Sequence, residues 1–598
     1  MDMNSTSPHF LGVNASVSGK SWRTRLENTR LATAIGQRHD LPEILSRVLA
    51  GRGVMVDEVE AFLTPTLRSL MPQPEALRDM EAGADRLAHA IRRGEAIAII
   101  GDYDVDGMTS TALLVRFLRS LAIDPLVHIP DRLEEGYGPS ITAVENLRRQ
   151  GAQVLVTVDC GTMAHVVLAH ATGLGLDVIV VDHHQAIAEL PSARAVINPN
   201  RLDDLSGLGY LAAVGVTLIL VAAVIRVLRR ADFFSAANPA PDLFSWLDLV
   251  ALGTICDVVP LVGLNRAYVN QGLKVMGKRC SPGLAALADT ARLRRRPDPH
   301  ALGYVLGPRL NAAGRLGLAL EGLGLLTTDD SGEASIRAQT LEVLNKQRQD
   351  IELKAFEVAA ADAERQLEND PHLRAIVVAG RDWHPGVLGL ISARIKERYG
   401  RPAIAMSTRA GEPFATASGR SVPGIDLGAL IREAQEAGIV VKGGGHAMAA
   451  GLTLESRRIE EFAAFMSDAL ARNNEPAAAP ELVIDGALSS AAAKPDLIEL
   501  LERAGPFGAG NPAPVFAFPA HFFSYADLAG KDHVRCTLKA SDGFSLKAVA
   551  FRSLGSPLGE MILSLRDRPA HVAGRLVIDD WNGARGAQLL IEDAAIVE

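Results

Sequence analysis

Cysteine is scarce in this chain of 598 residues, which has only four. The cysteines stand far apart and none belongs to a CxxC pair, so the sequence argues against a zinc ribbon and a disulfide framework. The opening residues, MDMNSTSPHF, lack the basic stretch and apolar core of a secretory signal. These absences lead us to expect a protein of the reducing cytoplasm. The cysteines are Cys160, Cys256, Cys280 and Cys536.

Residues 211–225, LAAVGVTLILVAAVI, form an apolar run that falls short of a membrane span. The run contains one polar residue, Thr217, and numbers 15 residues. A helix needs ~20 residues to cross a bilayer. We therefore predict a buried helix here and no membrane association.

An excess of positive charge is also absent, because 61 lysines and arginines face 70 aspartates and glutamates. The formal net charge of −9 disfavours a protein that coats nucleic acid with its whole surface. A local basic groove is still compatible with it, since phosphate contacts are local. At roughly 150 residues per domain, the length predicts about four domains.

Short apolar runs alternate with helical patterns between residues 76 and 335. This alternation predicts an α/β domain with a parallel sheet covered on both faces. The expected strands are AIAII (96–100), VLVTV (154–158) and VIVV (178–181), and the expected helices include 79–92 and 109–121.

The rest of the chain divides into four further segments. Residues 1–75 are expected to be an N-terminal lead-in with short helices, and residues 336–370 a long connecting helix, because 336–369 contain no Gly or Pro. A second, smaller α/β domain is expected at 371–475, followed by a linker, NNEPAAAPE, at 473–481. Residues 480–598 carry short strand-like runs separated by turns, which predicts a small β-barrel.

The strongest local signal is GDYDVDG at 101–107, where Asp102, Asp104 and Asp106 directly follow a predicted buried strand. Open α/β sheets bind ligands at the carboxyl ends of their strands. Three clustered carboxylates repel one another, and a hard divalent cation relieves that repulsion. The motif therefore predicts a metal site.

The motif is also compatible with two other kinds of loop. An EF-hand loop begins in the same way but needs a glutamate at its twelfth position, where this chain has Leu113. A strand also precedes the motif, whereas a helix precedes an EF-hand loop. The second alternative is a solvated acidic turn without metal, which is a common role for such residues in isolation.

Two more predicted strands end in side chains of the same kind. VLVTV is followed by Asp159, and VIVV is followed by Asp182, His183 and His184. A histidine pair alone is more often a core or surface feature, but successive parallel strands bring their ends to one edge. Imidazole beside carboxylates suits manganese-like cations better than calcium.

A further acid, Asp257, lies in the apolar run LGTICDVVPL and is a plausible fourth-segment ligand, because a buried acid needs a partner or a metal. This many carboxylates can hold two cations about 4 Å apart, the arrangement that supports phosphoryl transfer. The residues alone thus predict a two-metal hydrolase of a phosphate ester.

The segments DYDVDG, VDCG and VDHH resemble, in order and in placement at strand ends, the DHH phosphoesterases. That family is named for the run present here as Asp182-His183-His184. Within it the chain is similar to the RecJ-type nucleases over nearly everything from about residue 40 onward. The motifs that carry this similarity are PDRLEEGYG (130–138), GTICDVVP (253–260), GPRLNAAGRL (307–316), WHPGVLGLISAR (383–394), SGRS (418–421), GGGHAMAAG (443–451) and GPFGAGNPAPVF (505–516).

The resemblance implies a manganese- or magnesium-dependent exonuclease that degrades single-stranded DNA from 5′ to 3′ into mononucleotides in repair and recombination. It implies metal ligands at Asp104, Asp106, Asp159, His183 and Asp257. Asp102 would lie close by, and His184 would contact the scissile phosphate or orient a ligand. The implied substrate-binding residues are Arg132, Tyr137, Arg309, Asn311, Arg315, His384, Ser418, Arg420, Gly444, Gly445, His446 and Trp581.

The chemistry of the substrate motifs agrees with these roles, although each has a simpler explanation when taken alone. SGRS offers a hydroxyl and a guanidinium for phosphate, but it is also a common turn composition. GGGH suits a close approach of the backbone to a ligand, and equally a tight turn. Arg309 and Arg315 stand among small apolar residues, which favours a cleft, whereas Arg294–Arg296 are predicted to form a solvated face.

The predicted barrel at 480–598 resembles an OB-fold, which binds single strands through a basic groove and stacking aromatics. Most of its phenylalanines are expected to be core residues. Trp581, in the turn-like DDWNG, is the preferred stacking residue. Family analogy suggests a RecQ-type helicase and a single-strand-binding protein as partners, and a monomeric chain.

Two alternative functions have different discriminating features. A DHH enzyme of short oligoribonucleotides or cyclic dinucleotides would lack the terminal barrel that residues 480–598 predict. A non-catalytic binding protein on the same fold would have lost metal ligands, and here each ligand position is filled. RNA as an additional substrate stays open, since no residue pattern visibly recognises the 2′-hydroxyl.

Overall fold

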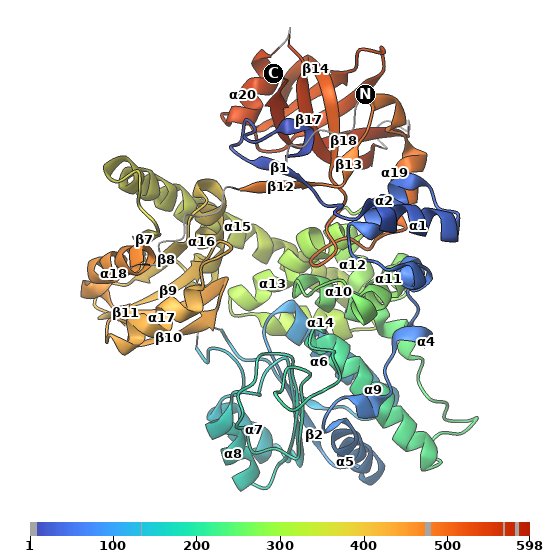
Figure 1. Ribbon diagram of the computed structural model, residues 1–598. Coiled ribbons are helices and arrows are strands. Elements are labelled where there is room, and N and C mark those ends of the chain that lie inside the picture. The colour runs from blue at the N-terminus through green and yellow to red at the C-terminus, as the bar shows by residue number, and fades with distance from the viewer. Residues whose placement is uncertain (1–8, 133, 473–479, 566–567, 580–584, 598) are drawn as a thin grey trace. The chain divides into compact units, whose positions relative to one another are not determined.

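The computed structural model describes residues 9–132, 134–472, 480–565, 568–579 and 585–597 (Figure 1). The chain falls into two compact units, and each is assembled from more than one stretch of sequence. The larger unit comprises residues 72–257 and 272–477, and it contains two separate sheets. Trp581 and residues 473–479 of the predicted linker lie outside the described residues.

The first sheet of the larger unit is parallel throughout, as the alternating pattern predicted. Its strands lie in the order β3-β2-β4-β5-β6, so the first strand in sequence, β2, sits between the second and the third. The three predicted strands are present as β2, β4 and β5, which are almost entirely buried because both faces of the sheet are covered. The strand bounds are β2 (Ile97–Gly101), β3 (Leu126–His128), β4 (Val154–Val158), β5 (Asp177–Val181) and β6 (Ala195–Ile197).

Helices cover both faces of this sheet (Figure 1). On one face α7 (Ile141–Arg149) and α8 (His165–Gly173) share a core with the strands. On the other face lie α5 (Met80–Arg93), α6 (Val105–Ser120) and α9 (Ala213–Arg230).

The apolar run 211–225 lies at the start of α9, which is buried along most of its length, as predicted. Across the ranges that the structure describes, no helix has the length and apolar character needed to span a bilayer. The run is apolar because it packs inside the protein.

A group of helices follows the first sheet and leads to the second. It comprises α10 (Leu247–Cys256), α12 (Pro282–Thr290), a π-helix (Ala301–Leu306), α13 (Gly307–Arg315), α14 (Ala319–Thr327) and α15 (Ser331–Asn369). The last of these is the long connecting helix that the residues without Gly and Pro predicted. It begins at the cap Asp330, whose side chain accepts a hydrogen bond from the Glu333 N–H (2.6 Å).

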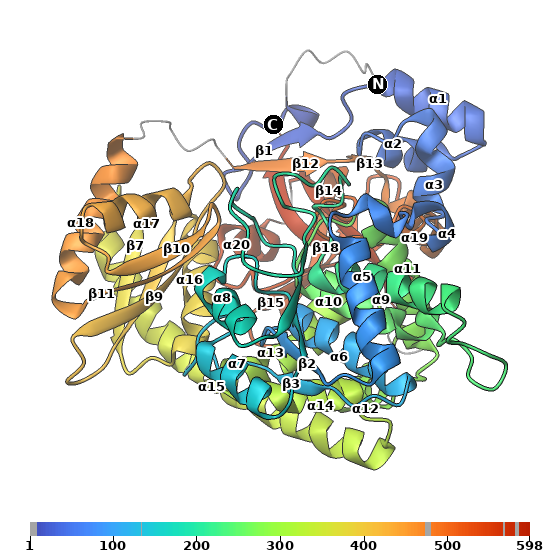
Figure 2. The ribbon, with the colours of Figure 1, turned by 90° about the horizontal axis from the view of Figure 1, so that it is seen from below.

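The second sheet of the larger unit is mixed, with strand order β10-β11-β9-β8-β7 and only the β7–β8 pair parallel. Helices α15 and α16 (Leu388–Tyr399) pack on one face, and α17 (Leu427–Glu436) and α18 (Ile459–Arg472) on the other (Figure 2). The strands are β7 (Ile376–Arg381), β8 (Ala403–Thr408), β9 (Phe414–Arg420), β10 (Lys442–His446) and β11 (Ala449–Glu455).

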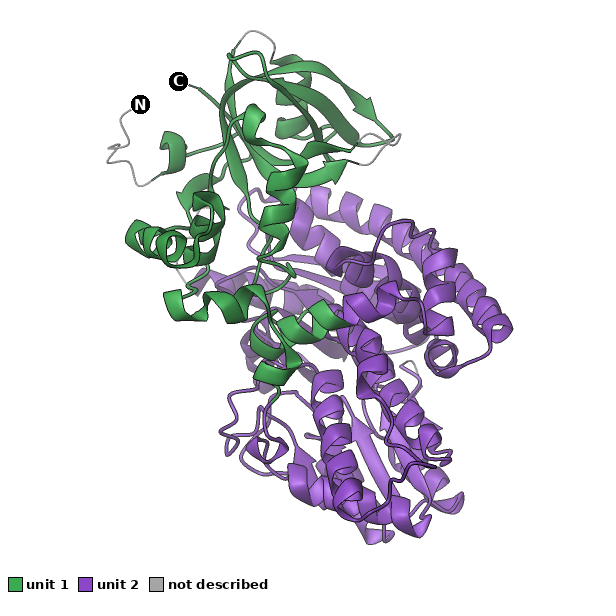
Figure 3. Cartoon of the chain, turned by 90° about the vertical axis from the view of Figure 1, so that its right-hand side faces the viewer, with its two compact units in different colours: residues 1–71, 258–271, 478–598 green, residues 72–257, 272–477 purple. Residues whose placement is uncertain are grey.

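The smaller unit joins residues 1–71, 258–271 and 478–598 (Figure 3). Its centre is a five-stranded barrel, closed by pairing of its first strand, β14, with β17. This barrel is the OB-type domain expected near the C-terminus. Its strands are β14 (Phe516–Ala529), β15 (His533–Lys539), β16 (Ser545–Ala550), β17 (Ala570–Asp579) and β18 (Gly586–Ile596), with α20 (Pro557–Ser564) between β16 and β17.

The N-terminal residues form part of this unit, which the interpretation as a lead-in did not anticipate. Strand β1 (Ser21–Thr24) pairs in parallel with β12 (Glu481–Ile484). Trp22 is fully buried and donates its indole N–H to Asp593 Oδ2 (2.9 Å). Helices α1 (Thr29–His39) and α2 (Glu43–Ala50) contribute side chains to the same core as the barrel. Such pairing over more than 400 residues leaves no local pattern in the sequence.

Candidate metal centre

The polar side chains that follow β2, β4 and β5 meet at one edge of the parallel sheet. Strand β2 is flanked by β3 and β4, so the connections leaving β2 and β4 turn to opposite sides of the sheet. Such a reversal in strand order creates a crevice beyond the carboxyl ends of the strands, where α/β sheets bind ligands. Asp102 and Asp104 follow β2 and Asp159 follows β4, so they line this crevice from both sides.

Five aspartates gather here, and most of them are buried. Asp102, Asp106 and Asp159 are each at most 3% exposed. Burial, with repulsion from neighbouring carboxylates, raises the pKa of Asp106 to about 7 and that of Asp257 to about 9. The same two causes hold the pKa values of Asp102 and Asp159 well above their usual range. The cluster therefore resists carrying its full negative charge without a compensating cation.

The unsatisfied polar atoms of the cluster indicate the same requirement. Asp102 Oδ1, Asp159 Oδ1, Asp257 Oδ2 and His183 Nε2 are buried and have no hydrogen-bond partner among the described residues. An isolated buried polar atom costs roughly 1–3 kcal/mol, so several of them at one place need an explanation. Bound cations would satisfy these atoms by accepting their electron pairs.

His183 stands at the centre of the cluster. Its Nε2 lies 3.3 Å from Asp159 Oδ1, 3.6 Å from Asp257 Oδ2 and 3.9 Å from Asp106 Oδ2. Burial is the main cause that lowers the pKa of His183 to about 4, so the ring is neutral near pH 7 and offers a lone pair.

Three overlapping sets of side chains bring their donor atoms within 4.8 Å of one another. Asp159 and His183 each belong to two of the sets, so the sets form one continuous centre. Carboxylate oxygens with imidazole nitrogen are a donor set that fits Mn²⁺ or Mg²⁺, as the sequence predicted. The sets are Asp102–Asp104–Asp159, Asp106–His183–Asp257 and Asp159–His183–His184.

Backbone amides hold two of the carboxylates in place. Asp106 accepts hydrogen bonds from the N–H groups of Ala213 (2.6 Å) and Val214 (3.0 Å), at the start of α9. Asp104 caps α6 by accepting from the Gly107 N–H (3.0 Å). Both carboxylates are thereby oriented before any ion binds.

Asp182 has a different role from the other acids. It accepts hydrogen bonds from the backbone N–H groups of Thr162 and His183, and its Oδ1 lies 2.7 Å from His184 Nδ1. These contacts hold the pKa of Asp182 below its usual range despite its burial. Although burial opposes it, the bond to Asp182 raises the pKa of His184.

Two asparagines that the sequence interpretation missed support the histidine pair. Asn198 donates to the backbone oxygen of His184 (2.9 Å), and Asn200 donates to that of His183 (2.5 Å). Both belong to the segment NPN, which directly follows β6. The signal was present, since β6 is another parallel strand that ends at the same edge.

A cluster of arginines lies beside the acidic centre. Arg315 is half-buried at the end of α13, and desolvation together with repulsion from Arg132, Arg348 and Arg420 lowers its pKa to about 10. A Cβ on the neighbouring Gly314 would come within 2.3 Å of the Tyr103 backbone oxygen. The arginines therefore adjoin the very loop that carries Asp102 and Asp104.

Other contacts tie this arginine cluster to the second sheet. Arg315 Nη1 donates to the Gly386 oxygen (2.9 Å), just before α16. Arg420, at the end of β9, donates to Ser418 Oγ at 3.3 Å, and the Arg132 guanidinium lies 5.1 Å from the centre of the Tyr103 ring. Clustered cations favour an anion for the same reason that clustered carboxylates favour a metal.

The remaining predicted substrate residues have varied surroundings. Tyr137 donates to the Asp159 backbone oxygen (3.0 Å) and lies 3.2 Å from His184 Nδ1. Arg309 donates a hydrogen bond from its Nε to Glu342 (2.7 Å). Of the two arginines in GPRLNAAGRL, Arg315 is therefore the one that belongs to the arginine cluster. His384 Nδ1 accepts from the Gly386 N–H (3.1 Å).

Asn311 lies on α13, and Gly444, Gly445 and His446 are exposed on β10. No hydrogen bond among the described residues connects these four to the metal loop. Arg294–Arg296 are exposed, in agreement with their prediction as a solvated face. The buried Phe516 and Phe523 likewise agree with the prediction of core phenylalanines.

The parallel sheet, the acids at its strand ends and the Asp-His-His run define a DHH-type phosphoesterase. Family models agree in three places: the N-terminal domain of the DHH family matches residues 96–254, the DHHA1 domain 372–472 and the RecJ OB domain 484–593. The chain belongs to the RecJ family of single-stranded-DNA-specific exonucleases.

Relatives in several bacteria support this family membership. The chain is 37% identical to the single-stranded-DNA-specific exonuclease RecJ of Salmonella typhimurium over 571 residues, which cover 93% of this chain and 96% of the relative. It is 32% identical to that of Bacillus subtilis, over 96% of this chain and 70% of the relative. The crystal structure of RecJ from Thermus thermophilus in complex with Mn²⁺ matches with a TM-score of 0.79 at 28% identity, covering 96% of this chain and 79% of that one.

Proposed function

We propose that this chain is a metal-dependent exonuclease that degrades single-stranded DNA from the 5′ end to mononucleotides in DNA repair and recombination. The observation that carries the proposal is the continuous set of buried acids and histidines at the strand ends. Kinship to exonucleases that act on single-stranded DNA supports the choice of substrate. The 5′ to 3′ polarity rests on the family resemblance.

Two ions fit the three overlapping donor sets. One would be held by Asp102, Asp104 and Asp159, and the other by Asp106, His183 and Asp257. A bound pair of Mn²⁺ or Mg²⁺ ions lowers the pKa of a water molecule and stabilises the attacking and leaving oxygens of the phosphodiester. Asp159 and His183, which belong to more than one set, would couple the two positions.

His184 is the protein group best placed to contact the scissile phosphate. Asp182 accepts the hydrogen bond from His184 Nδ1, which fixes the ring and favours its protonated form. Nε2–H, which lies 3.4 Å from the Tyr137 hydroxyl, would then donate to a phosphate oxygen. Tyr137, beside the same ring, limits its rotation.

The arginine cluster would bind the DNA backbone next to the metal centre. Arg132, Arg315 and Arg420 are the cluster's substrate residues, and Ser418 adds a hydroxyl. Guanidinium groups bind phosphate in bidentate fashion, which fixes the register of the strand relative to the ions. The barrel of the smaller unit would bind single-stranded DNA as well.

We expect a monomer in the cytoplasm, with a RecQ-type helicase and a single-strand-binding protein as partners that supply or cover the single strand. Trp581 stays the expected stacking residue of the barrel.

The test uses single-stranded DNA labelled at either end, with Mn²⁺, Mg²⁺ or a chelator, and compares the wild-type chain with Asp159→Asn. Early release of mononucleotides from the 5′ label, abolished by chelator and by the substitution, is the expected result. Early release from the 3′ label would contradict the proposed 5′ to 3′ polarity. Turnover of dinucleotides without degradation of DNA would move the chain to the small-substrate branch of the DHH enzymes.

A further inference from the structure

The outer edge of β7 in the second sheet has no strand partner within the described residues. Ile376 donates its N–H to the Pro402 oxygen (2.9 Å), and Asp382 donates to the Thr408 oxygen (2.8 Å). Along a strand in a parallel pair, the N–H and C=O groups of successive residues point alternately to one side and the other. Those of the even-numbered residues of β7 therefore face β8. The N–H and C=O groups of its odd-numbered residues point outward, away from β8.

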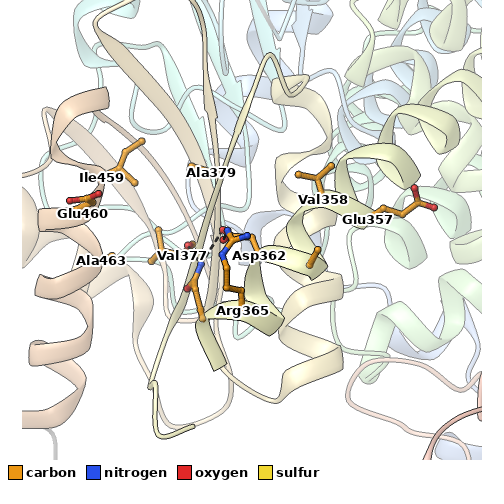
Figure 4. Close-up of a pocket in the computed structure, with 11 residues that line it drawn as sticks. Glu357, Val358, Asp362, Arg365, Val377, Ala379, Ile459, Glu460 and Ala463 are labelled. Atoms are coloured by element: carbon orange, nitrogen blue, oxygen red, sulfur yellow. Dashed lines mark hydrogen bonds and ion pairs between the residues drawn. The ribbon is translucent and has the colours of Figure 1, made fainter. Parts of the chain in front are cut away.

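This edge opens into a groove of about 840 Å³ between α15 and α18 (Figure 4). Val377 and Ala379 form its floor, and Ala379 is exposed. Gln366 covers part of the edge by donating to the Val377 oxygen (2.8 Å). Small and apolar side chains line both walls: Val358 and Ala361 from α15, and Ile459 and Ala463 from α18.

The composition of the groove differs from that of a protected edge. Edge strands are usually blocked by lysines, prolines, bulges or a covering segment. Here the strand residues in the groove are small and apolar, and Val358 on the wall is 58% exposed. Apart from the Val377 oxygen, which Gln366 occupies, the edge is thus open to pairing with an added strand.

The charge of the groove is acidic. Glu357 on α15 and Glu460 on α18 stand on opposite walls (Figure 4) and have no ion-pair partner in the described ranges. The groove's one arginine, Arg365, is paired with Asp362. An occupant with basic side chains would therefore be favoured on both sides.

We propose that the outer edge of β7 is a docking site for an extended segment of a partner protein in which pairs of apolar residues alternate with pairs of basic residues. The segment adds to the sheet as a further strand, with its backbone bonded to Ala379 and, where it displaces Gln366, to Val377. Successive side chains of the added strand face α15 and α18 in turn. On each wall an apolar side chain therefore contacts Val358 or Ile459, and a basic one pairs with Glu357 or Glu460. Strand addition of this kind takes its affinity from the backbone and its specificity from alternate side chains.

The test measures, by fluorescence anisotropy, the binding to the full chain of a fluorescein-labelled heptapeptide of sequence Val-Val-Lys-Lys-Val-Val-Lys, which as a strand presents both valine and lysine to each wall. A matched peptide with glutamate in place of lysine is the control. We expect the lysine peptide to bind about tenfold more tightly, since two acidic walls attract one peptide and repel the other. Equal affinity for the two peptides, or no saturable binding of either, would overturn the proposal.

Two variants separate backbone pairing from charge. Ala379→Pro removes an outward N–H, which an edge strand tolerates, and should weaken the lysine peptide about tenfold. Glu357→Gln with Glu460→Gln should weaken it about three- to tenfold, whereas Glu368→Gln, an exposed acid elsewhere on α15, should not. Unchanged affinity in both groove variants contradicts the site. Hydrolysis of single-stranded DNA should be the same in all of them, which verifies folding independently.

Discussion

Asp159 and Asp182 end neighbouring strands and are similarly buried, yet their pKa values move in opposite directions. Asp159 faces other carboxylates and has an unsatisfied oxygen. Asp182 accepts hydrogen bonds from three backbone amides and from a histidine ring. The first environment demands a metal ion, and the second produces a fixed anion that orients its neighbour.

This difference predicts separable effects of two isosteric substitutions. Asp182→Asn removes the negative charge and one of the two acceptor oxygens beside His184, and it should lower kcat by about 10- to 100-fold, the usual cost of losing such support. Asp159→Asn should abolish activity. In a thermal melt, Mn²⁺ should raise Tm in the wild type and in Asp182→Asn, but much less in Asp159→Asn. A loss of the Mn²⁺ effect in Asp182→Asn would mean that Asp182 is itself a ligand.

Asp248, in the first turn of α10, is a buried acid that the proposed chemistry does not use. Burial raises its pKa to about 6, so the folded protein keeps this proton at a pH where the unfolded chain has released it. The unfolded state then binds fewer protons, and stability falls as pH rises from about 4 to 6. At neutral pH the charged group costs at most about 3 kcal/mol.

We therefore expect Asp248→Asn to be more stable than the wild type at pH 7.5, by about 1–3 kcal/mol. The gain should shrink toward pH 4.5, where the wild-type side chain is protonated. Urea unfolding at the two pH values measures it. A difference that does not depend on pH would show that the side chain acts through packing alone.

At the scale of single elements, α13 couples the arginine cluster to the metal loop. Gly314→Ala would place a Cβ 2.3 Å from the Tyr103 oxygen, so α13 and the loop must separate. Overpacking of this kind costs about 1–3 kcal/mol and should reduce both activity and Mn²⁺ affinity. Gly173→Ala on α8 is the matched control, because a Cβ there meets nothing within 4 Å. Wild-type metal affinity in Gly314→Ala would contradict this coupling.

The elements that the sequence predicted best are the buried strands of the parallel sheet. Continuous Val and Ile runs followed by Asp carry both the strand and its functional end, so β2, β4 and β5 were located within a residue or two. The part that Asp182 plays was not predicted, because a ligand and a supporting anion are the same residue type. Only the atoms around the carboxylate distinguish them.

Contacts between elements were harder to predict than the elements themselves. Arg309 and Arg315 lie six residues apart on one helix motif, and their sequence surroundings led to the same expectation for both. In the structure Arg309 forms an ion pair with Glu342, whereas Arg315 lies among other arginines. Tertiary packing decides which face of α13 contacts the metal loop, and local sequence patterns do not encode that choice.

At the scale of the whole molecule, the smaller unit is built from both ends of the chain. Deleting residues 480–598 would leave β1 without its partner strand and expose the core around Trp22. We expect that truncated protein to aggregate and to be cleaved first within residues 1–71 in limited proteolysis. Deleting residues 1–71 as well should restore solubility. Equal solubility of the two truncations would argue that the N-terminal segment folds alone.

The joining of β1 to β12 also sets an order of events during synthesis. Roughly 400 residues separate the N-terminal and C-terminal parts of the smaller unit, and the larger unit lies between them in sequence. At roughly 5–20 residues per second, the first strand waits about 20–80 s for its partner to be translated. The segment that leaves the ribosome first is thus among the last to be buried, and the nuclease sheet can form well before the barrel that would hold its DNA.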